Sequence, residues 1–304
     1  MGYRTAPNSA HLPAGTRTGI LVDPHPGLEA AVARISVIIP TRNRPDDLRR
    51  CLAGLEECSQ RLASTTNIRL HEVVVADDAS TRPHSISPAH ASPLPVIVVR
   101  NRARLGAGAS RARAVAVASG DVLAFLDDDA VPRGDWLSVA GSVGNEKPAI
   151  SGRVLPFDSG LVSAARQARY DARYTALSAG DPVGFFAGGN SAILTSEYES
   201  IGGFTRAGVG GDNSLAETLA ERGRPVRFEP QLVVAHRNGK GLYRALVDAL
   251  SSGRDHPVPL APQQAFRLVT TGAVGSTQPV RALNFLLGTV HAAGRVNLRT
   301  GGRA

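Results

Sequence analysis

An apolar run that ends in three carboxylates lies near the middle of the chain, Val122-Leu123-Ala124-Phe125-Leu126-Asp127-Asp128-Asp129. Its five apolar residues, bounded by Gly120-Asp121 and Pro132, predict a buried strand whose carboxyl end opens into a loop. Three adjacent carboxylates repel one another unless something positive lies beside them. A divalent cation such as Mg²⁺ or Mn²⁺ fits, because it takes oxygen ligands and shares them with substrate phosphates. A solvated acidic turn that caps the next helix is the alternative.

Strand and helix patterns alternate through the first half of the chain. Further strands are predicted at 35–39, 72–76 and 96–99, and helical patterns start at Asp46 and cover 107–118. This alternation predicts an α/β fold with a mostly parallel, Rossmann-like nucleotide-binding sheet flanked by helices.

Acidic residues end two of these strands, at Asp77-Asp78 and at Asp127–Asp129. The turn after the first strand, Pro40–Pro45, has no G-x-G-x-x-G pattern, so a dinucleotide site is not indicated. One carboxylate pair can accept hydrogen bonds from a base or ribose while the other holds a metal on a diphosphate. Two unrelated solvated turns would look the same, but the division of labour favours a nucleotide-sugar site.

Composition limits the partners and the compartment. The chain has 34 basic and 26 acidic residues, a net charge of +8, and only two lysines, Lys147 and Lys240. Basic residues are spread along the chain and aromatics are few, so no nucleic-acid partner is indicated. Cys51 and Cys58 lie two helical turns apart, about 10 Å and too far for a disulfide. With no signal pattern and no bilayer-length apolar run, we expect a cytoplasmic protein, at most peripheral on a membrane surface.

Seven short motifs resemble, in order and spacing, those of family 2 glycosyltransferases of the GT-A fold. They are Ser36–Arg44, Val75–Ser80, Phe125–Asp129, Gly188–Ala192, Ile201–Phe204, Gly211-Asp212 and Val233–His236. One motif is a weak signal, whereas seven in order are a strong one. The resemblance implies a GT-A catalytic domain at 35–236, after a flexible N-terminal extension at 1–34 and before a helical C-terminal extension at 237–304.

The resemblance also implies where the donor and the metal bind. A nucleoside-diphosphate sugar, most commonly a UDP-sugar in this family, would contact Pro40, Thr41, Arg44, Asp77, Asp78, Arg111, Asp127 and Asp128. Asp129 and Asp127, the ends of the D-x-D motif, and His236 would hold Mn²⁺ or Mg²⁺. For His236, a strand-end histidine without metal contact stays open as the alternative.

Asp212 is the implied catalytic base. An acceptor hydroxyl has a very high pKa, so a positioned carboxylate must take its proton as the new bond forms. One base and one metal on opposite sides of the anomeric carbon imply an inverting displacement, whereas a retaining hydrolase needs two carboxylates close to the bond. The family usually has acids where this chain has Gly211 and Ser214. A helix N-cap is therefore the alternative for Asp212, and Glu217 is a substitute base.

Three residues are weaker candidates on the acceptor side, namely Gly189, Asn190 and Trp136. The segment Phe185–Asn190 predicts a strand and turn whose glycines allow close backbone approach, and Asn190 could bond a sugar hydroxyl. Trp136 could stack on a sugar, although packing at the start of a helix at 132–139 is favoured. The acceptor, whether a glycan, a lipid-linked sugar or a small natural product, is not readable.

The C-terminal extension shows two helical patterns, at 241–252 and 280–296, joined by a Pro-rich segment. The apolar residues of the second pattern, with Arg281 and Arg295, fit a membrane-surface helix. They fit better a helix packed on the catalytic core or on a second copy of the chain.

Two other functions stay open. A sugar-phosphate nucleotidyltransferase would need a Gly-rich loop with a basic residue after the first strand, which Pro40–Pro45 does not resemble. A non-catalytic nucleotide-sugar-binding homologue is suggested by Gly211 and Ser214. Transfer or hydrolysis of a donor separates this second alternative from a glycosyltransferase.

Overall fold

The structure is a computed structural model that describes residues 32–62, 67–82, 94–205, 211–239, 241–254 and 260–296. The chain divides into two compact units, Met1–Ala31 and Val32–Ala304, and every described residue belongs to the second. The predicted N-terminal extension therefore lies outside the described residues, except that Ala33 and Arg34 already belong to the first strand.

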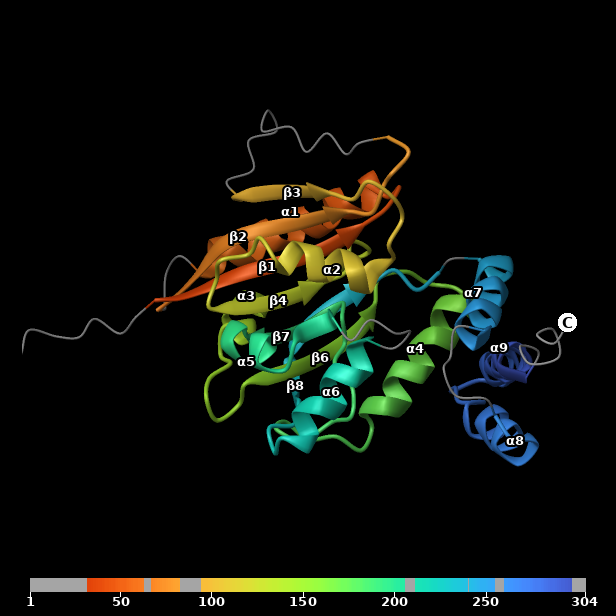
Figure 1. Ribbon diagram of the computed structural model, residues 1–304. Coiled ribbons are helices and arrows are strands. Elements are labelled where there is room, and N and C mark those ends of the chain that lie inside the picture. Colours follow the sequence, from red (N-terminus) through yellow and green to blue (C-terminus); the bar gives the residue numbers. More distant parts are fainter. Residues whose placement is uncertain are drawn as a thin grey trace, which may run out of the picture. The chain divides into compact units, whose positions relative to one another are not determined.

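The described strands form one eight-stranded sheet in the order β3-β2-β1-β4-β7-β6-β8-β5 (Figure 1). Their bounds are β1 Ala33–Thr41, β2 Ile68–Asp77, β3 Val96–Arg100, β4 Val122–Leu126, β5 Ala130–Pro132, β6 Ala149–Pro156, β7 Asn190–Leu194 and β8 Arg227–His236. Strands β3, β2, β1 and β4 pair in parallel, as the sequence predicts. Beyond β4 the sheet is mixed, because β7 is antiparallel to both β4 and β6 while β6 and β8 are parallel.

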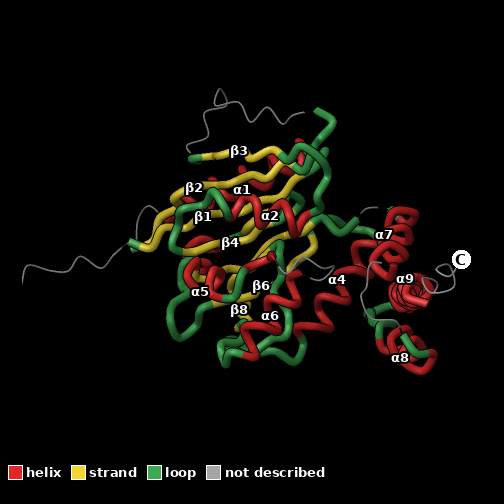
Figure 2. The backbone as a smooth tube through the Cα atoms, viewed as in Figure 1, coloured by secondary structure: helices red, strands yellow, loops and turns green. Residues whose placement is uncertain are grey.

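Helices cover both faces of this sheet, as the tube in Figure 2 shows. Their bounds are α1 Pro45–Leu62, α2 Ala107–Val115, α3 Trp136–Ala140, α4 Leu161–Tyr174, α5 Thr195–Ser200 and α6 Gly211–Glu221. Figure 1 shows α2 in front of the parallel strands and α1 behind them. Val37 and Ile39 join the core cluster of α1, whereas their neighbour Ile38 joins the cluster of Ala114 in α2. Strand β1 is therefore buried on both faces, which explains its continuous apolar run.

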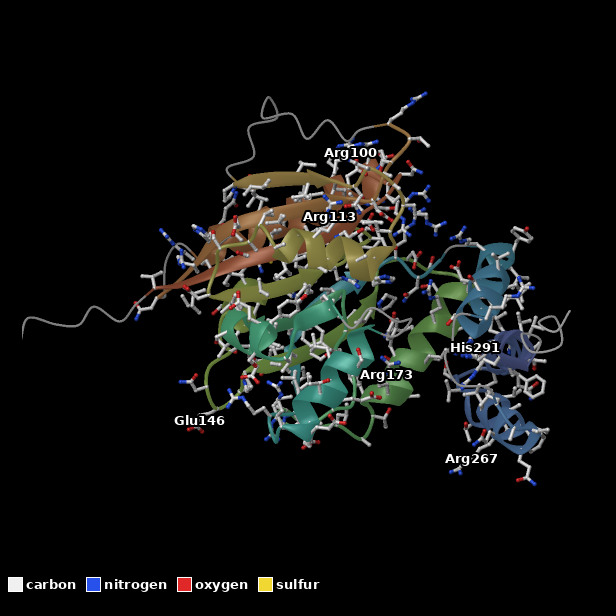
Figure 3. The ribbon with its side chains drawn as sticks, in the orientation of Figure 1. Arg100, Arg113, Glu146, Arg173, Arg267 and His291 are labelled. Carbon is white, nitrogen blue, oxygen red and sulfur yellow. The ribbon has the colours of Figure 1, made fainter. Side chains whose placement is uncertain are left out.

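Three helices follow the sheet, α7 Leu242–Arg254, α8 Pro262–Thr271 and α9 Gln278–Val296. The sequence predicts two helices here, but the structure has a third, α8. Its first-turn proline starts a helix within the Pro-rich segment that was expected only to join the other two. Leu283 and Leu287 of α9 pack against Ala165 of α4, in agreement with the favoured packing role. Phe285 and Leu286 are exposed, and Figure 3 shows Arg267 projecting from α8. No described helix is both long and apolar enough to cross a membrane.

The segment around Pro132 also differs from expectation. A helix was predicted at 132–139, but Ala130–Pro132 forms strand β5 beside β8, and α3 begins only at Trp136. Strand β5 tolerates Pro132 because it lies at the edge of the sheet and pairs on one side only. The N–H that proline lacks therefore interrupts no ladder between central strands.

A buried carboxylate joins the amino ends of three parallel segments. Oε1 of Glu72 in β2 accepts hydrogen bonds from Ser36 Oγ at 2.7 Å, from Ser119 N at 2.6 Å and from Ser119 Oγ at 3.1 Å. Ser36 Oγ in turn accepts from Gly120 N, so β1, β2 and the start of β4 share one network. Burial opposes the charge, but these hydrogen bonds outweigh it and lower the pKa of Glu72 below the ordinary value of 4.5.

We expect Glu72→Gln to lower the free energy of unfolding by about 1–2 kcal/mol at pH 7, because neutral hydrogen bonds replace charge-assisted ones. Because the folded-state pKa is depressed, this stabilisation is present above the ordinary value of 4.5 and is lost as the pH falls through the lower folded-state value. Urea unfolding at pH 7 and in acid measures both effects. The control is Glu146→Gln, an exposed side chain that points outward in Figure 3. If the difference in unfolding free energy between the wild type and Glu72→Gln does not change with pH, the role of the charge is contradicted.

Candidate active site

Strand register brings the predicted site residues to one edge of the sheet. Thr41 at the end of β1 pairs directly with Asp77 at the end of β2. Leu126 at the end of β4 pairs with Asn190 at the start of β7. Ala130, just after the acidic triplet, pairs with His236 at the end of β8. The edge that the parallel strands point to is where α/β sheets bind ligands.

Two carboxylates and an imidazole form a candidate metal centre. Ligand atoms of Asp127, Asp129 and His236 all lie within 4.8 Å of one another. Nε2 of His236 lies 3.0 Å from Asp129 Oδ1, and Arg111 Nη2 donates to Asp127 Oδ1 at 2.7 Å. Oxygen and imidazole ligands of this kind suit Mn²⁺ and Mg²⁺. The residues present therefore fit a hard divalent cation.

The middle carboxylate, Asp128, faces a different set of partners. Its oxygens accept hydrogen bonds from Thr41 Oγ1 and Arg44 Nη1, each at 2.8 Å, and Arg44 Nη1 also lies 2.9 Å from Asp129 Oδ2. Burial raises the pKa of Asp128 to about 6, and neighbouring Asp129 and Asp127 add to this while Arg44 opposes it. Burial thus disfavours the charged form of Asp128, which a bound cation would favour.

His236 is held from both ring nitrogens. Its Nδ1 lies 3.0 Å from Asn238 Oδ1, opposite the contact of Nε2 with Asp129. Burial lowers the pKa of His236, but the Asp129 carboxylate outweighs burial and the pKa is raised above the ordinary value. A lone pair on Nε2 and a carboxylate oxygen repel each other at this distance, so the contact needs a proton or a cation between them.

Asp77 and Asp78 organise the loops beside the acidic triplet. Asp77 accepts a hydrogen bond from Ser80 N and forms an ion pair with Arg100. Asp78 accepts from Leu105 N at 2.7 Å, from Gly106 N at 2.9 Å and from the Asn101 amide at 2.9 Å. Burial opposes the charge of Asp78, but these donors lower its pKa. Both carboxylates thereby fix the backbone that forms one wall of the site.

A cavity of about 240 Å³ borders the acidic triplet at Asp127. Its lining includes Arg111, Asp127, Tyr170, Arg173, Tyr174, Phe185, Phe186, Ala187, Gly188, Gly189 and His236. Tyr170 and Tyr174 are stacked on α4, and the Arg173 guanidinium lies 4.9 Å from the centroid of the Phe185 ring. Figure 3 shows Arg173 beside α4. Aromatic faces and cations next to polar groups form a surface on which sugar rings pack.

Trp136 and Asn190, two weak acceptor-side candidates, are hydrogen-bonded to each other in the structure. The Trp136 indole is 0% exposed and donates its Nε1–H to Asn190 Oδ1 at 2.8 Å. The Asn190 amide donates both N–H groups, to the carbonyls of Arg153 and Leu232. These contacts bury the indole and occupy both N–H groups of the amide, and Asn190 also lines the cavity. Together they brace the floor of the cavity.

Sequence reasoning missed Tyr170, Arg173 and Asn238. The Tyr-x-x-Arg-Tyr spacing at 170–174 places these aromatic and basic side chains on one helical face, but a packed surface helix has the same pattern. Asn238 follows a strand end that already carried a candidate ligand, and nothing in its spacing marks it. The implied base, Asp212, lies in the first turn of α6, and its side chain is outside the described part of the chain.

Comparisons with known proteins agree with this geometry. The family model described as "Glycosyl transferase family 2" matches residues 36–201 of this chain. A pre-mycofactocin glycosyltransferase of Mycobacterium tuberculosis is 27% identical over 214 residues, which cover 66% of this chain and 42% of that protein. This chain therefore spans less than half the length of the curated relative that it matches.

Solved structures share the fold. A mannosyltransferase from Pyrobaculum calidifontis, in complex with GDP-Man and Mn²⁺, superposes with a TM-score of 0.55 at 19% identity, covering 87% of this chain and 74% of that one. GalNAc-T7 with UDP, GalNAc and Mn²⁺ superposes with a TM-score of 0.52 at 16% identity, covering 78% of this chain and 48% of that one.

The mixed sheet, with an acidic triplet at the carboxyl end of β4 and a strand-end histidine on β8, defines the GT-A class of α/β fold. Helices flank this sheet on both faces (Figure 2). The chain belongs to glycosyl transferase family 2.

We expect Gly189→Ala to displace the Asp127 carboxylate, because a Cβ at Gly189 would lie 2.1 Å from Asp127 Oδ2. Titration with Mn²⁺, followed by electron paramagnetic resonance, should show affinity weaker by about tenfold or more, since ligand geometry sets affinity. Gly108→Ala is the control, because its Cβ would meet nothing within 4 Å. Equal Mn²⁺ affinity in the wild type and Gly189→Ala would contradict the placement of Asp127 in the metal centre.

Proposed function

We propose that the protein is an inverting, divalent-metal-dependent glycosyltransferase that moves a sugar from a nucleoside-diphosphate sugar, of which a UDP-sugar is the first to test, to an acceptor hydroxyl. The observation that carries this proposal is the convergence of Asp127, Asp129 and His236 within 4.8 Å at the sheet edge of a family 2 chain. The Mn²⁺ and nucleotide-sugar ligands named for the solved relatives support it.

The donor would lie across the carboxyl ends of β1, β2 and β4. Pro40, Thr41, Asp77 and Asp78 form the edge that would face the base and ribose. Arg111 and Arg44 are the cations beside the acidic triplet, and each pairs with a triplet carboxylate. Both guanidinium groups are thus positioned to contact a diphosphate through charge-assisted hydrogen bonds.

A bound divalent cation would neutralise the charge that develops on the leaving diphosphate. Arg111, which pairs with Asp127 and is largely buried, would add to this neutralisation. Its side chain is 7% exposed, so its field is weakly screened by solvent. The chain's own contribution is to hold these charges in place before the donor arrives.

The acceptor would enter through the aromatic cavity. Gly189 and Asp127 both line this cavity, and the missing side chain of Gly189 leaves room for the Asp127 carboxylate there. Asp212 at the start of α6 is the proposed general base, which would take the proton of the acceptor hydroxyl. Pre-mycofactocin, named for the curated relative, is one acceptor to include in a test panel.

The deciding experiment measures turnover of a panel of nucleotide sugars with Mn²⁺, with Mg²⁺ and with chelator. We expect turnover of one donor that requires metal, and we expect Asp129→Ala to reduce it by at least about 100-fold. Asp135→Ala is the matched control, because Asp135 is exposed and its side chain makes no capping hydrogen bond. Equal turnover with and without chelator would overturn metal dependence.

We expect Asp212→Asn to lower kcat by about 100- to 10,000-fold and to leave donor affinity unchanged, as removal of a general base does. Glu217→Gln, an exposed position on the same helix, is the comparison. Steady-state kinetics with both substrates separates kcat from KM. Full activity in Asp212→Asn together with loss in Glu217→Gln would move the role of base to Glu217.

A further inference from the structure

A buried chain of side-chain hydrogen bonds starts at the candidate metal centre and runs away from it. His236 Nδ1 lies 3.0 Å from Asn238 Oδ1, and Asn238 Nδ2 lies 3.3 Å from Gln167 Oε1. Gln167 Nε2 lies 3.0 Å from the carbonyl of Val154 and 2.8 Å from Asp171 Oδ1. Asn238 is 0% exposed and Gln167 is 9% exposed. The orientation of each amide therefore matters energetically, because water cannot replace a wrong partner.

The direction of donors and acceptors along these hydrogen bonds is set at Gln167, the end farther from His236. A backbone carbonyl and a carboxylate can only accept hydrogen bonds, so the two groups that face Gln167 Nε2 must both receive N–H donors. Only the NH₂ group of the amide supplies two donors. Gln167 Oε1 consequently points at Asn238 and can only accept.

The same logic passes through Asn238 to the imidazole. Gln167 Oε1 requires a donor, so the NH₂ group of Asn238 faces it and Asn238 Oδ1 faces His236. Because Oδ1 is an acceptor, Nδ1 of His236 must carry a hydrogen. In the neutral imidazole, the lone pair is then on Nε2, which is the nitrogen that faces Asp129.

We propose that Asn238 and Gln167 are positioning residues that hold His236 as the Nδ1–H tautomer, with Nε2 free to bind a divalent cation beside Asp129. This inference rests on the proposed metal centre. The amides act on the metal only through the histidine, as outer hydrogen-bond partners of metal-binding histidines do.

The backbone of this loop is anchored separately. Asp158 accepts hydrogen bonds from Asn238 N at 3.0 Å and from Gly239 N at 2.6 Å, and Ser163 Oγ donates to it at 2.8 Å. A substitution of the Asn238 side chain therefore leaves these backbone contacts available. The effect of the amide on the imidazole can be tested without releasing the loop.

The test is Mn²⁺ affinity of the full chain, measured by electron paramagnetic resonance. We expect Asn238→Leu to weaken binding by about 10- to 100-fold. Asn238→Asp keeps an acceptor for Nδ1–H but places its second oxygen against Gln167 Oε1, so we expect a smaller loss of affinity than in Asn238→Leu. Gln167→Glu offers only acceptors to the Val154 carbonyl and to Asp171, so it should disturb the chain and weaken binding as well.

Asn284→Leu is the matched control for loss of a buried amide. Asn284 in α9 is also 0% exposed, and it donates to the carbonyls of Ala165 and Val274. We expect it to lower thermal stability and to leave Mn²⁺ affinity unchanged. Equal weakening by Asn238→Leu and Asn284→Leu would mean that the effect on metal is only a loss of stability.

Nitrogen-15 NMR of the histidine side chains, in mildly alkaline buffer with saturating Mg²⁺ as the diamagnetic divalent cation, reads the tautomer directly. We expect His236 to carry its proton on Nδ1 in the wild type and in Asn238→Asp, and to populate both tautomers in Asn238→Leu. An Nε2–H tautomer in the wild type would overturn the inference. Wild-type protein that binds no Mn²⁺ but holds the Nδ1–H tautomer would instead count against the proposed metal centre alone.

Discussion

The crowding of three carboxylates at the end of β4 is the constraint on which the other features of the site depend. The carboxylates have different sets of partners: Asp127 pairs with Arg111, Asp128 with Thr41 and Arg44, and Asp129 with His236 and Arg44. These partners come from β1 and the turn after it, from α2 and from β8, so the charge can be held only when distant parts of the chain meet. Burial raises the pKa of Asp128 to about 6, so its charged form is disfavoured in the site as it stands. A bound cation would favour the charged form of such a carboxylate.

The mixed sheet places two different surfaces on either side of this triplet. The parallel strands bring Thr41 and Asp77 to one side, where carboxylates fix the loop backbones. The antiparallel β7 starts at Asn190, and this brings the glycine turn and the aromatic face of α4 to the other side. The Trp136–Asn190 hydrogen bond joins these parts beneath the cavity floor. Two chemically different sides of the triplet thus follow from the change of strand direction at β4 and β7.

Much of the parallel half could be predicted, because its inner strands such as β1 and β4 are buried apolar runs ended by a turn signal. Short-range patterns failed where a residue's role depends on a distant partner. Pro132 resembled the start of a helix, yet it ends a strand whose register is set by β8. Helix α8 lies in a segment whose prolines indicated only a connection between helices. The spacing of Trp136 and Asn190 does not reveal that they bond each other across 54 positions.

The sequence by itself determined the family, the acidic triplet and the candidate ligands Asp127, Asp129 and His236, because these are local motifs at strand ends. Only the tertiary structure decided what those groups face. It separated Asp128 from the metal-ligand group, buried Trp136, and connected His236 through Asn238 to Gln167 on a helix about 70 positions earlier. The physical reason is that hydrogen-bond polarity and charge balance depend on which atoms lie within about 3 Å, and strand register rather than sequence separation sets those neighbours.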